Sequence, residues 1–308
     1  MPPAAVSAGP AKPWPRLDYS SWADTCATLQ LWTQVVGKIR LALAPRVNHW
    51  WGVALYVTAR GLTTSPMPWQ GGALQIDFDF IEHQLILRLS DGRAERVALV
   101  PRSVADFHAE VMQRLRALGV DVHLWTMPVE IPDAIAFDVD RAHQSYDAAA
   151  ANLFWQQLVQ VHRVFSQFRA RFLGKCSPAH FFWGSFDMAV TRFSGRAAPP
   201  IQRTAPNVAL WVMQEAYSHE VSSAGFWPGN GGAGKAAFYS YAYPEPEGFA
   251  QATIAGATYD STLGEFVLPY DTVAASASPD ETLLNFLQAT YEAAADRGKW
   301  DRVALERS

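Results

Sequence analysis

Two stretches of the chain carry the same spacing of large apolar residues, and a constant distance separates them. The first set steps by 3, 4, 3 and 4 residues from Leu29 to Leu43, which places its members on one face of a helix. The second set makes the same steps from Leu158 to Phe172, each member 129 positions after its counterpart. One helical pattern repeated at a fixed offset predicts that the chain is built from two similar halves.

Strand patterns follow the two helices in the same order. Residues 49–58 are aromatic and β-branched, with apolar residues on both faces, as in a strand that is covered on both sides. Residues 177–199 are longer and of the same kind, and they are predicted as a buried central strand that ends in a turn bearing arginines. At an offset of 132 lie the dipeptides Trp51-Gly52 and Trp183-Gly184 and the arginines Arg60 and Arg192. The shared order indicates an internal duplication.

The remaining patterns complete an α+β architecture. In the first half they predict strands at 74–80, 85–90 and 93–99, a helix at 103–118 and a closing strand at 120–131. Asp91-Gly92 is a strong hairpin turn that is expected to pair Arg88 with Glu95. In the second half they predict strands at 238–243 and 265–273 and a helix at 280–297. We therefore expect two similar halves, each an antiparallel sheet with flanking helices, packed as one body.

The chain of 308 residues suits two such units. We assign residues 14–132 to the first repeat and residues 133–308 to the second, which carries an inserted loop region at 201–235. Residues 1–13 are rich in Pro and Ala and are expected to be disordered.

Composition excludes several classes of protein. Hydrophobic residues make up 49% and charged residues 18%, which indicates a folded chain. The net charge of −4, without a basic run, argues against a nucleic-acid partner. The N-terminus lacks the features of a signal peptide, no apolar run is long enough for a membrane span, and there are only two cysteines. These features predict a cytoplasmic protein with no membrane partner, whose partner is a small molecule and whose oligomeric state is open.

The most prominent formal motif is Gly229–Lys235, which fits the first seven positions of a phosphate-binding P-loop. The eighth position should be Ser or Thr to hold magnesium, and it is Ala236. The surrounding residues also lack the strand before and the helix after that a P-loop needs. We expect a flexible loop that binds no nucleotide, and the cofactor remains unknown.

Polar residues of the insertion form the first candidate site. Glu215 and His219 are four positions apart and share one face whether the segment is helical or extended. A carboxylate beside an imidazole orients it as a general base, both side chains ligate a metal ion, or the two form a structural hydrogen-bonded pair. His219-Glu220 begins like a zinc-protease signature, but Ser223 replaces the second histidine, so we assign no metal ligands.

The central strand carries the second group of candidates. Asp187 is expensive to bury unless it is paired, and Arg192 and Arg196 follow at the strand end. The alternatives are an ion pair that holds the turn, or an anion site in which the guanidinium groups meet a carboxylate or phosphate. His180 is either a core histidine or part of a pocket. We predict that Asp187, Arg192, Glu215 and His219 share one cleft, with His180 at its edge and Trp227 closing an aromatic wall.

With these residues in view, the chain resembles a family of uncharacterised bacterial proteins known only as a domain of unknown function. The resemblance spans nearly everything from Trp14 to Leu305 and implies no activity or cofactor. Its most specific phrases begin at Val36, Asn48, Thr58, His180, Thr191, Glu215 and Gly225.

Two classes of function follow from the residues, and a third is weaker. The first is an enzyme acting on a small anionic molecule, with His219, Glu215, Asp187 and His180 as catalytic groups. In that hypothesis Arg192, Arg196 and Trp227 bind the ligand. The alternative is a non-catalytic module that holds a small ligand in an aromatic pocket. The third is a structural or partner-binding protein.

Overall fold

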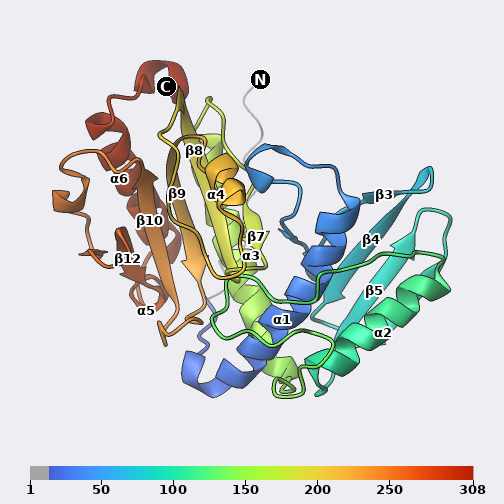
Figure 1. The fold of residues 1–308 in the computed structure, drawn as a ribbon. Helices are drawn as coiled ribbons and strands as arrows, with labels where there is room; N and C mark the ends of the chain where they lie inside the picture. Colours follow the sequence, from blue (N-terminus) through green and yellow to red (C-terminus); the bar gives the residue numbers. More distant parts are fainter. Residues whose placement is uncertain (1–13, 308) are drawn as a thin grey trace, which may run out of the picture.

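The computed structural model describes residues 14–307, so the N-terminal stretch expected to be disordered lies outside the described residues. It contains two antiparallel sheets of six strands each, with flanking helices (Figure 1). The predicted α+β class with two similar halves is therefore confirmed. The helices are α1 (Tyr19–Leu43), η1 (Asn48–Trp50), α2 (Val104–Ala117), α3 (Ala148–Ala170), α4 (Leu210–Ala216), η2 (Phe249–Gln251), α5 (Tyr270–Ala274), α6 (Pro279–Arg297) and α7 (Arg302–Leu305).

The first sheet has the order β1-β2-β4-β5-β6, with β3 paired to β4. The second has the order β11-β12-β10-β9-β8-β7. The strands of the first sheet are β1 (Tyr56–Val57), β2 (Gly61–Thr63), β3 (Met67–Trp69), β4 (Gly72–Asp79), β5 (Gln84–Leu89) and β6 (Ala94–Ala98). Those of the second are β7 (His180–Phe182), β8 (Asp187–Ala197), β9 (His219–Trp227), β10 (Ala237–Tyr243), β11 (Thr258–Asp260) and β12 (Glu265–Pro269).

Helix α1 lies between the two sheets and is buried around most of its circumference (Figure 1). A helix that contacts protein on every side must pair its polar side chains, because an unpaired buried polar group is costly. The four-residue spacing of Gln30, Gln34 and Lys38 aligns their polar groups on one face, where they bind backbone groups of two loops. Helix α1 is therefore the element that fixes loops from both halves of the chain.

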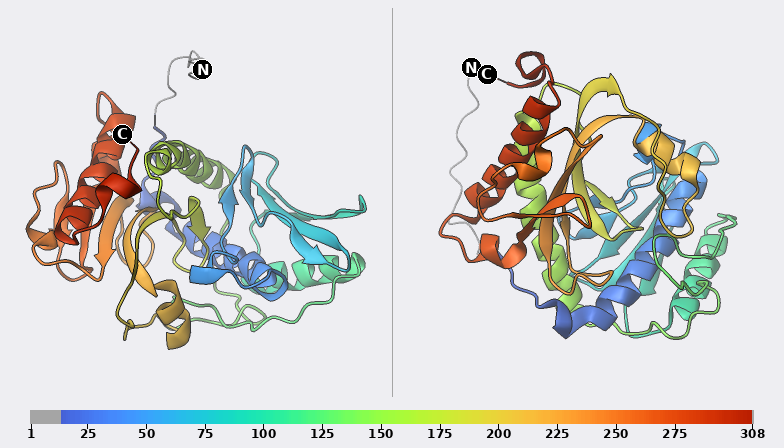
Figure 2. Two further views of the ribbon diagram at one scale, coloured as in Figure 1. Left: turned by 90° about the horizontal axis from the view of Figure 1, so that it is seen from above. Right: turned by 60° about the vertical axis from the view of Figure 1, so that its left-hand side comes forward.

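The two sheets meet at their edge strands. The backbone groups of Leu55 and Phe181 exchange two hydrogen bonds, of 2.9 and 2.8 Å, beside β1 and β7. Helices α3 and α6 cover one face of the second sheet, whereas α1 and α4 lie on its other side (Figure 2). The candidate site described below lies on this second side.

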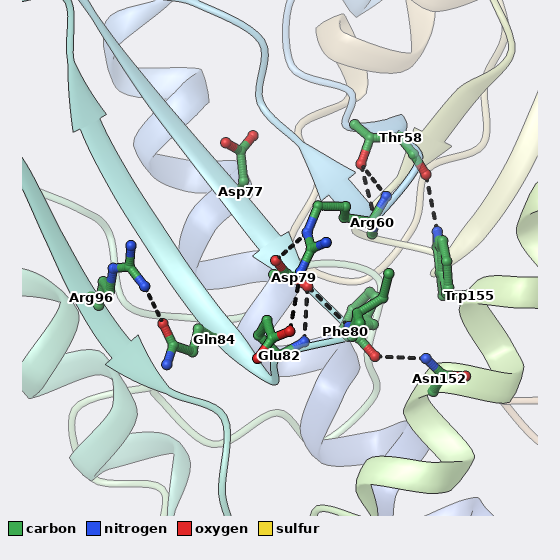
Figure 3. A network of polar contacts seen from close by, with 12 residues as sticks. Thr58, Arg60, Asp77, Asp79, Phe80, Glu82, Gln84, Arg96, Asn152 and Trp155 are labelled. Carbon is green, nitrogen blue, oxygen red and sulfur yellow. Dashed lines mark hydrogen bonds and ion pairs between the residues drawn. The ribbon is translucent and has the colours of Figure 1, made fainter. Parts of the chain in front are cut away.

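A polar network joins the first sheet to helix α3 (Figure 3). The Asn152 side chain donates to the carbonyl of Phe80 at 2.8 Å, and Trp155 Nε1 donates to the carbonyl of Thr58 at 3.0 Å. Next to these contacts, Arg60 pairs with Asp79 at the end of β4. The first repeat is thus tied to the second through its own turns.

Four predicted strands differ from the observed structure. The strand predicted at 265–273 ends at Pro269, because helix α5 begins at Tyr270. Residues 49–58 contain η1 and a turn before the two-residue strand β1, because His49 and Trp50 adopt positive φ angles that end any extended segment. Residues 120–131 form an irregular loop and no strand. Residues 177–199 form a hairpin, since Trp183–Phe186 make a turn between β7 and β8 and Phe186 has a φ of 63°.

The hairpin at Asp91-Gly92 is confirmed, but its register differs by one residue from the prediction. Arg88 lies opposite Ala94, and Glu95 lies opposite Leu87. Arg88 forms its ion pair with Asp77 on the neighbouring strand β4 instead. The turn residues predicted the hairpin correctly, whereas the number of loop residues decided which side chains face each other.

The duplication itself remains a prediction, although the two sheets run through their main strands in a comparable order. The proposed equivalence of Trp51-Gly52 with Trp183-Gly184 is wrong. The first dipeptide precedes β1, whereas the second follows β7 in the hairpin turn. The equivalence of Arg60 with Arg192 fails for the same reason, since Arg60 lies in a turn and Arg192 lies within β8.

None of the helices within residues 14–307 combines the length and the apolar character that crossing a membrane requires.

Candidate functional site

A cavity of about 840 Å³ lies between the two halves, on the face of the second sheet that α3 and α6 leave free. Strands β8, β9, β10 and β12 form its floor. Helix α1, the η1 turn, the loop at 123–130 and helix α4 supply the rest of its lining. Most of the lining is apolar or aromatic, as in ordinary small-molecule sites, which are of similar volume.

Strand alternation decides which residues of β8 face this cavity. Asp187, Ala189 and Thr191 line it, because residues two apart in a strand point to the same side. Arg192 points to the opposite side, where its guanidinium lies 3.5 Å from the ring centre of Phe168. Asp187 and Arg192 are five positions apart, so one strand cannot bring their side chains together.

Asp187 is 7% exposed and accepts hydrogen bonds only from hydroxyl groups. The donors are Ser185 Oγ on one carboxylate oxygen and Tyr239 OH on the other. No cation within residues 14–307 forms an ion pair with it. Burial therefore raises the pKa of Asp187, against the smaller opposing effect of the two hydroxyl groups.

Glu130 brings a second carboxyl group to the cavity from the first repeat. Its loop is fixed by Gln34, whose side-chain amide exchanges hydrogen bonds of 2.9 Å with both backbone groups of Val129. The Glu130 carboxyl lies against Gly184, where any Cβ atom would overlap it. Glu130 is exposed along the cavity. The surrounding protein atoms, followed by the charge of Asp187, raise the pKa of Glu130 to about 7.

Glu265 at the start of β12 supplies the third carboxyl group. Burial, followed by the negative charge of Asp187, raises its pKa to about 7, although the charge of Arg203 acts in the opposite direction. Glu265 and Glu130 have no side-chain hydrogen bond to any residue of the described chain. Three acidic groups therefore share one cavity, and none of them forms an ion pair within residues 14–307.

Tyrosine and hydroxyl side chains complete the floor in pairs. Tyr217 OH and Tyr241 OH lie 2.8 Å apart, and Thr191 Oγ1 lies 2.9 Å from Ser223 Oγ. Burial, followed by the charge of Asp187, raises the pKa of Tyr239 well above its ordinary value. The tyrosines therefore remain neutral and act as hydrogen-bond donors near neutral pH.

Tryptophan side chains form much of the walls. Trp183 packs so closely on α1 that a Cβ atom at Gly37 would overlap its ring, and its Nε1 donates to the carbonyl of Val53 at 2.8 Å. Trp227, at the end of β9, also lines the cavity. Rings held in this way give a rigid wall that any ligand would contact directly.

Helix α4 lies at the cavity and contacts the first repeat through one arginine. The Arg46 guanidinium lies 4.8 Å from the ring centres of both Trp50 and Trp211, and it forms an ion pair with Glu215. Trp50 and Trp211 are themselves lining residues. Glu215 thus helps to hold α4 in place and does not line the cavity.

The structure brings together only part of the predicted cleft. Of the predicted residues, Asp187 and Trp227 line the cavity. Arg192 is excluded because it lies on the other face of β8. The hypothesis that Arg192 pairs with Asp187 or joins it in an anion site is therefore wrong.

Arg196 also lies away from the cavity. It forms an ion pair with Glu220, and it donates to the carbonyl oxygens of Gly298 and Lys299. These carbonyls lie at the C-terminal end of α6, where a cation is favourable. The geometry explains Arg196 as a group that holds a helix end.

The two remaining histidine candidates lie beside the cavity. His180 is fully buried, and burial lowers its pKa to about 3. The ring of His219 lies 5.5 Å from that of His49, which is itself a lining residue. His49 Nδ1 donates to the carbonyl of Ala216 at 3.0 Å, and its Nε2 accepts from Lys175 at 2.7 Å. The catalytic role proposed for His180 and His219 stays a prediction.

Two further hypotheses from the sequence, the P-loop motif and a metal site, can be compared directly with the structure. Residues 229–235 form a loop that leads into strand β10 and not into a helix, so they lack P-loop geometry. Within residues 14–307, no three His, Cys, Asp or Glu side chains are grouped as a metal ion would require.

The sequence patterns did not predict most of the residues that line the cavity, although some of these residues lie on predicted strands. The predicted strand 238–243 carries Tyr239 and Tyr241 on one face, a polar and aromatic stripe on an otherwise apolar sheet. Glu265 begins another predicted strand. No sequence pattern marks Glu130 as a site residue, because residues 120–131 predict a strand where the structure has an irregular loop.

The fold and this cavity define an α+β protein with a small-molecule-sized, acidic and aromatic cavity between two antiparallel sheets. The chain belongs to DUF5996, a family of unknown function, whose family model matches residues 14–307. The family resemblance seen in the sequence is therefore confirmed. No curated protein and no solved structure matches the chain.

Proposed function

We propose that the protein binds a small, largely apolar organic molecule in the cavity between its two sheets. The observation that carries this proposal is an open-sided cavity of about 840 Å³ whose lining is mostly apolar and aromatic, with a small number of polar groups among these residues. Such a site buries the apolar body of a ligand and orients it with few polar contacts. We do not keep the hypothesis of an anionic substrate, because neither Arg192 nor Arg196 lines the cavity.

The experiment uses 4-phenylbutan-1-ol as a neutral probe and isothermal titration calorimetry as the readout. Ala189→Phe places a ring in the cavity and should abolish binding. Ala94→Phe makes the same change at an exposed position of β6 and should leave binding unchanged. Binding that survives Ala189→Phe, or no heat with any apolar probe of this size, would contradict the proposal.

A second candidate function is catalysis by proton transfer. It is favoured by two carboxyl groups, Glu130 and Glu265, whose pKa values of about 7 suit a general acid or base. The test is the exchange of the α protons of 4-phenylbutan-2-one in D₂O, followed by NMR. Catalysis predicts faster exchange that Glu130→Gln or Glu265→Gln removes, and a rate equal to that of buffer contradicts it.

A further inference from the structure

None of the three acidic side chains of the cavity forms an ion pair within residues 14–307. Asp187 accepts from two hydroxyl groups, and neither Glu130 nor Glu265 has a side-chain hydrogen bond within residues 14–307. They come from three separate elements, the 123–130 loop, β8 and β12. Asp187 is buried, Glu265 is half-buried and Glu130 is exposed along the cavity. A buried negative charge without a cationic partner is costly, so an arrangement that places two further carboxyl groups in the same cavity as Asp187 needs an explanation.

The walls around these groups supply an independent observation. Indole and phenol rings attract a cation through their electron-rich faces, and tryptophan does so most strongly. Trp51 and Trp125 line the cavity but already have the ammonium groups of Lys175 and Lys38 over their rings. Trp183 and Trp227 also line it and have no such cation within residues 14–307, and the tyrosines of the floor lie in the same cavity. Acidic groups at the base of an aromatic cavity are the combination that recognises an organic cation.

The basic residues of the lining do not fill this role. Lys38 donates to the backbone carbonyls of Trp125 and Met127, and its ammonium lies 4.5 Å from the ring centre of Trp125. His49 is engaged by Ala216 and Lys175. His123 is the remaining basic group of the lining, and it lies on the exposed outer part of the 123–130 loop.

We infer that the ligand of this cavity is an organic amine, whose protonated nitrogen lies against Asp187, Glu130 and Glu265 while its apolar part contacts the tryptophan walls. This inference rests on the proposed function and names the chemical class of its ligand. The amine supplies a positive charge in direct contact with these carboxyl groups, none of which forms an ion pair within residues 14–307.

The experiment compares three probes that share one apolar body: 4-phenylbutylamine, 4-phenylbutan-1-ol and 4-phenylbutyrate. Calorimetry at pH 7.5 should show that the amine binds about tenfold or more tightly than the alcohol, because a hydrogen bond to a charged group is stronger than a neutral one. The carboxylate should bind most weakly. An alcohol or carboxylate that binds as tightly as the amine would overturn the inference and leave the proposed function intact. Failure of all three probes would remove both.

Single substitutions of the cavity carboxyl groups then test which of them contacts the charged nitrogen of the amine. Asp187→Asn should weaken amine binding about tenfold and change alcohol binding by less than about twofold, since it keeps the size of the side chain. Glu265→Gln provides a second variant should Asp187→Asn lower the melting temperature. Glu247→Gln, on an exposed loop, is the matched control and should change neither affinity. Unchanged amine affinity in both cavity variants would overturn the inference.

A proton count gives a readout that does not depend on affinity. Glu130 and Glu265 titrate near neutral pH, so a cation bound beside them favours their ionised forms and releases protons. Titrations at pH 7 in two buffers of different ionisation enthalpy should show about half a proton or more released per amine bound, and none with the alcohol. Proton uptake, or no release with the amine, contradicts the inference.

Discussion

The two sheets each bury one aspartate at the end of a strand, and the two side chains have opposite surroundings. Asp79, at the end of β4, is 5% exposed and accepts from Arg60 Nε at 2.6 Å and from the amides of Ile81 and Glu82 at 3.0 Å (Figure 3). Asp187, at the start of β8, is 7% exposed and has only hydroxyl donors. The first is a fully paired structural group, whereas the second has an unmet charge.

Their pKa values shift in opposite directions for this reason. Burial tends to raise the pKa of both carboxyl groups. At Asp79 the hydrogen bond from Arg60 and the two amide donors outweigh burial, so the pKa is lowered. At Asp187 burial prevails and the pKa is raised. The comparison teaches that burial alone does not decide the direction of a pKa shift, because the donors around the carboxyl group decide it.

The largest expected effect comes from removing each aspartate in turn. Asp79→Ala should lower the free energy of unfolding by about 2–3 kcal/mol at pH 7, because two backbone amides and Arg60 lose their acceptor. Asp187→Ala should cost less than about 1 kcal/mol, since it removes an unpaired buried charge. Urea denaturation measures both. Because the pKa of Asp79 is lowered, its contribution should disappear as the pH falls below about 4. Equal losses for the two variants would break the comparison.

The second prediction concerns the pH dependence of stability. Glu130 and Glu265 have raised pKa values of about 7, so the folded state holds their protons more tightly than the unfolded state does. Their contribution is complete below about pH 4.5 and is lost as the pH rises through 7. The titratable groups that share the cavity with them are Asp187, the three tyrosines, Lys38, His49 and His123. The charges of Arg203 and Asp260 also act on Glu265, in opposite directions.

Thermal unfolding between pH 5 and pH 8 should test this. We expect Glu130→Gln and Glu265→Gln each to raise the melting temperature by about 2–5 °C relative to the unaltered protein at pH 8, and to change it less at pH 5. Asp79→Asn is the opposite control and should lower it at both values. If the two glutamine variants raise the melting temperature equally at pH 5 and pH 8, the predicted direction of the pH dependence is wrong.

The third prediction concerns Arg192, on the other face of β8 from Asp187. Its guanidinium contacts aromatic rings, and Nη2 donates to the carbonyl of Phe168, while its Nε and Nη1 atoms have no partner within residues 14–307. Arg192→Met keeps the size of the side chain and removes a charge that burial disfavours. The free energy of unfolding should therefore change by less than about 1 kcal/mol. Binding of the cavity probes should be unchanged. A selective loss of binding with normal stability would restore Arg192 to the site.

The smallest effect is expected for His219→Ala. The side chain lies outside the cavity lining, and its Nδ1 contacts only the neighbouring Ser218 hydroxyl, at 3.0 Å. Unfolding should change by less than about 0.5 kcal/mol, and probe affinity by less than about twofold. Loss of binding would instead support the sequence-based hypothesis that His219 acts at the site.

Much of the fold was accessible to sequence reasoning because periodicity reports local geometry. The helices at α1, α2, α3 and α6 and the strands β4, β5 and β10 were predicted from spacing alone. The failures are local as well. Residues 49–58 looked like a strand by composition, but positive φ angles at His49 and Trp50 break it. Aromatic composition cannot report such angles.

The site was less predictable, for a reason that two residues illustrate. Alternation along β8 already implied that Asp187 and Arg192 face opposite sides, so that correction was available from the sequence. Glu130 is different, because its position depends on Gln34, a residue 95 positions earlier that binds the loop beside it. Periodic patterns in the sequence compare residues only a few positions apart, so they do not reveal a contact between residues 95 positions apart.

The sequence by itself therefore determined the α+β class, most helices and strands, and the face of β8 on which Asp187 lies, since each of these depends on neighbours a few residues apart. Only the tertiary structure decided that Glu130, Asp187 and Glu265 meet in one aromatic cavity without a cation. That meeting depends on how α1 joins the two sheets, and the energy of a buried charge depends on every group around it.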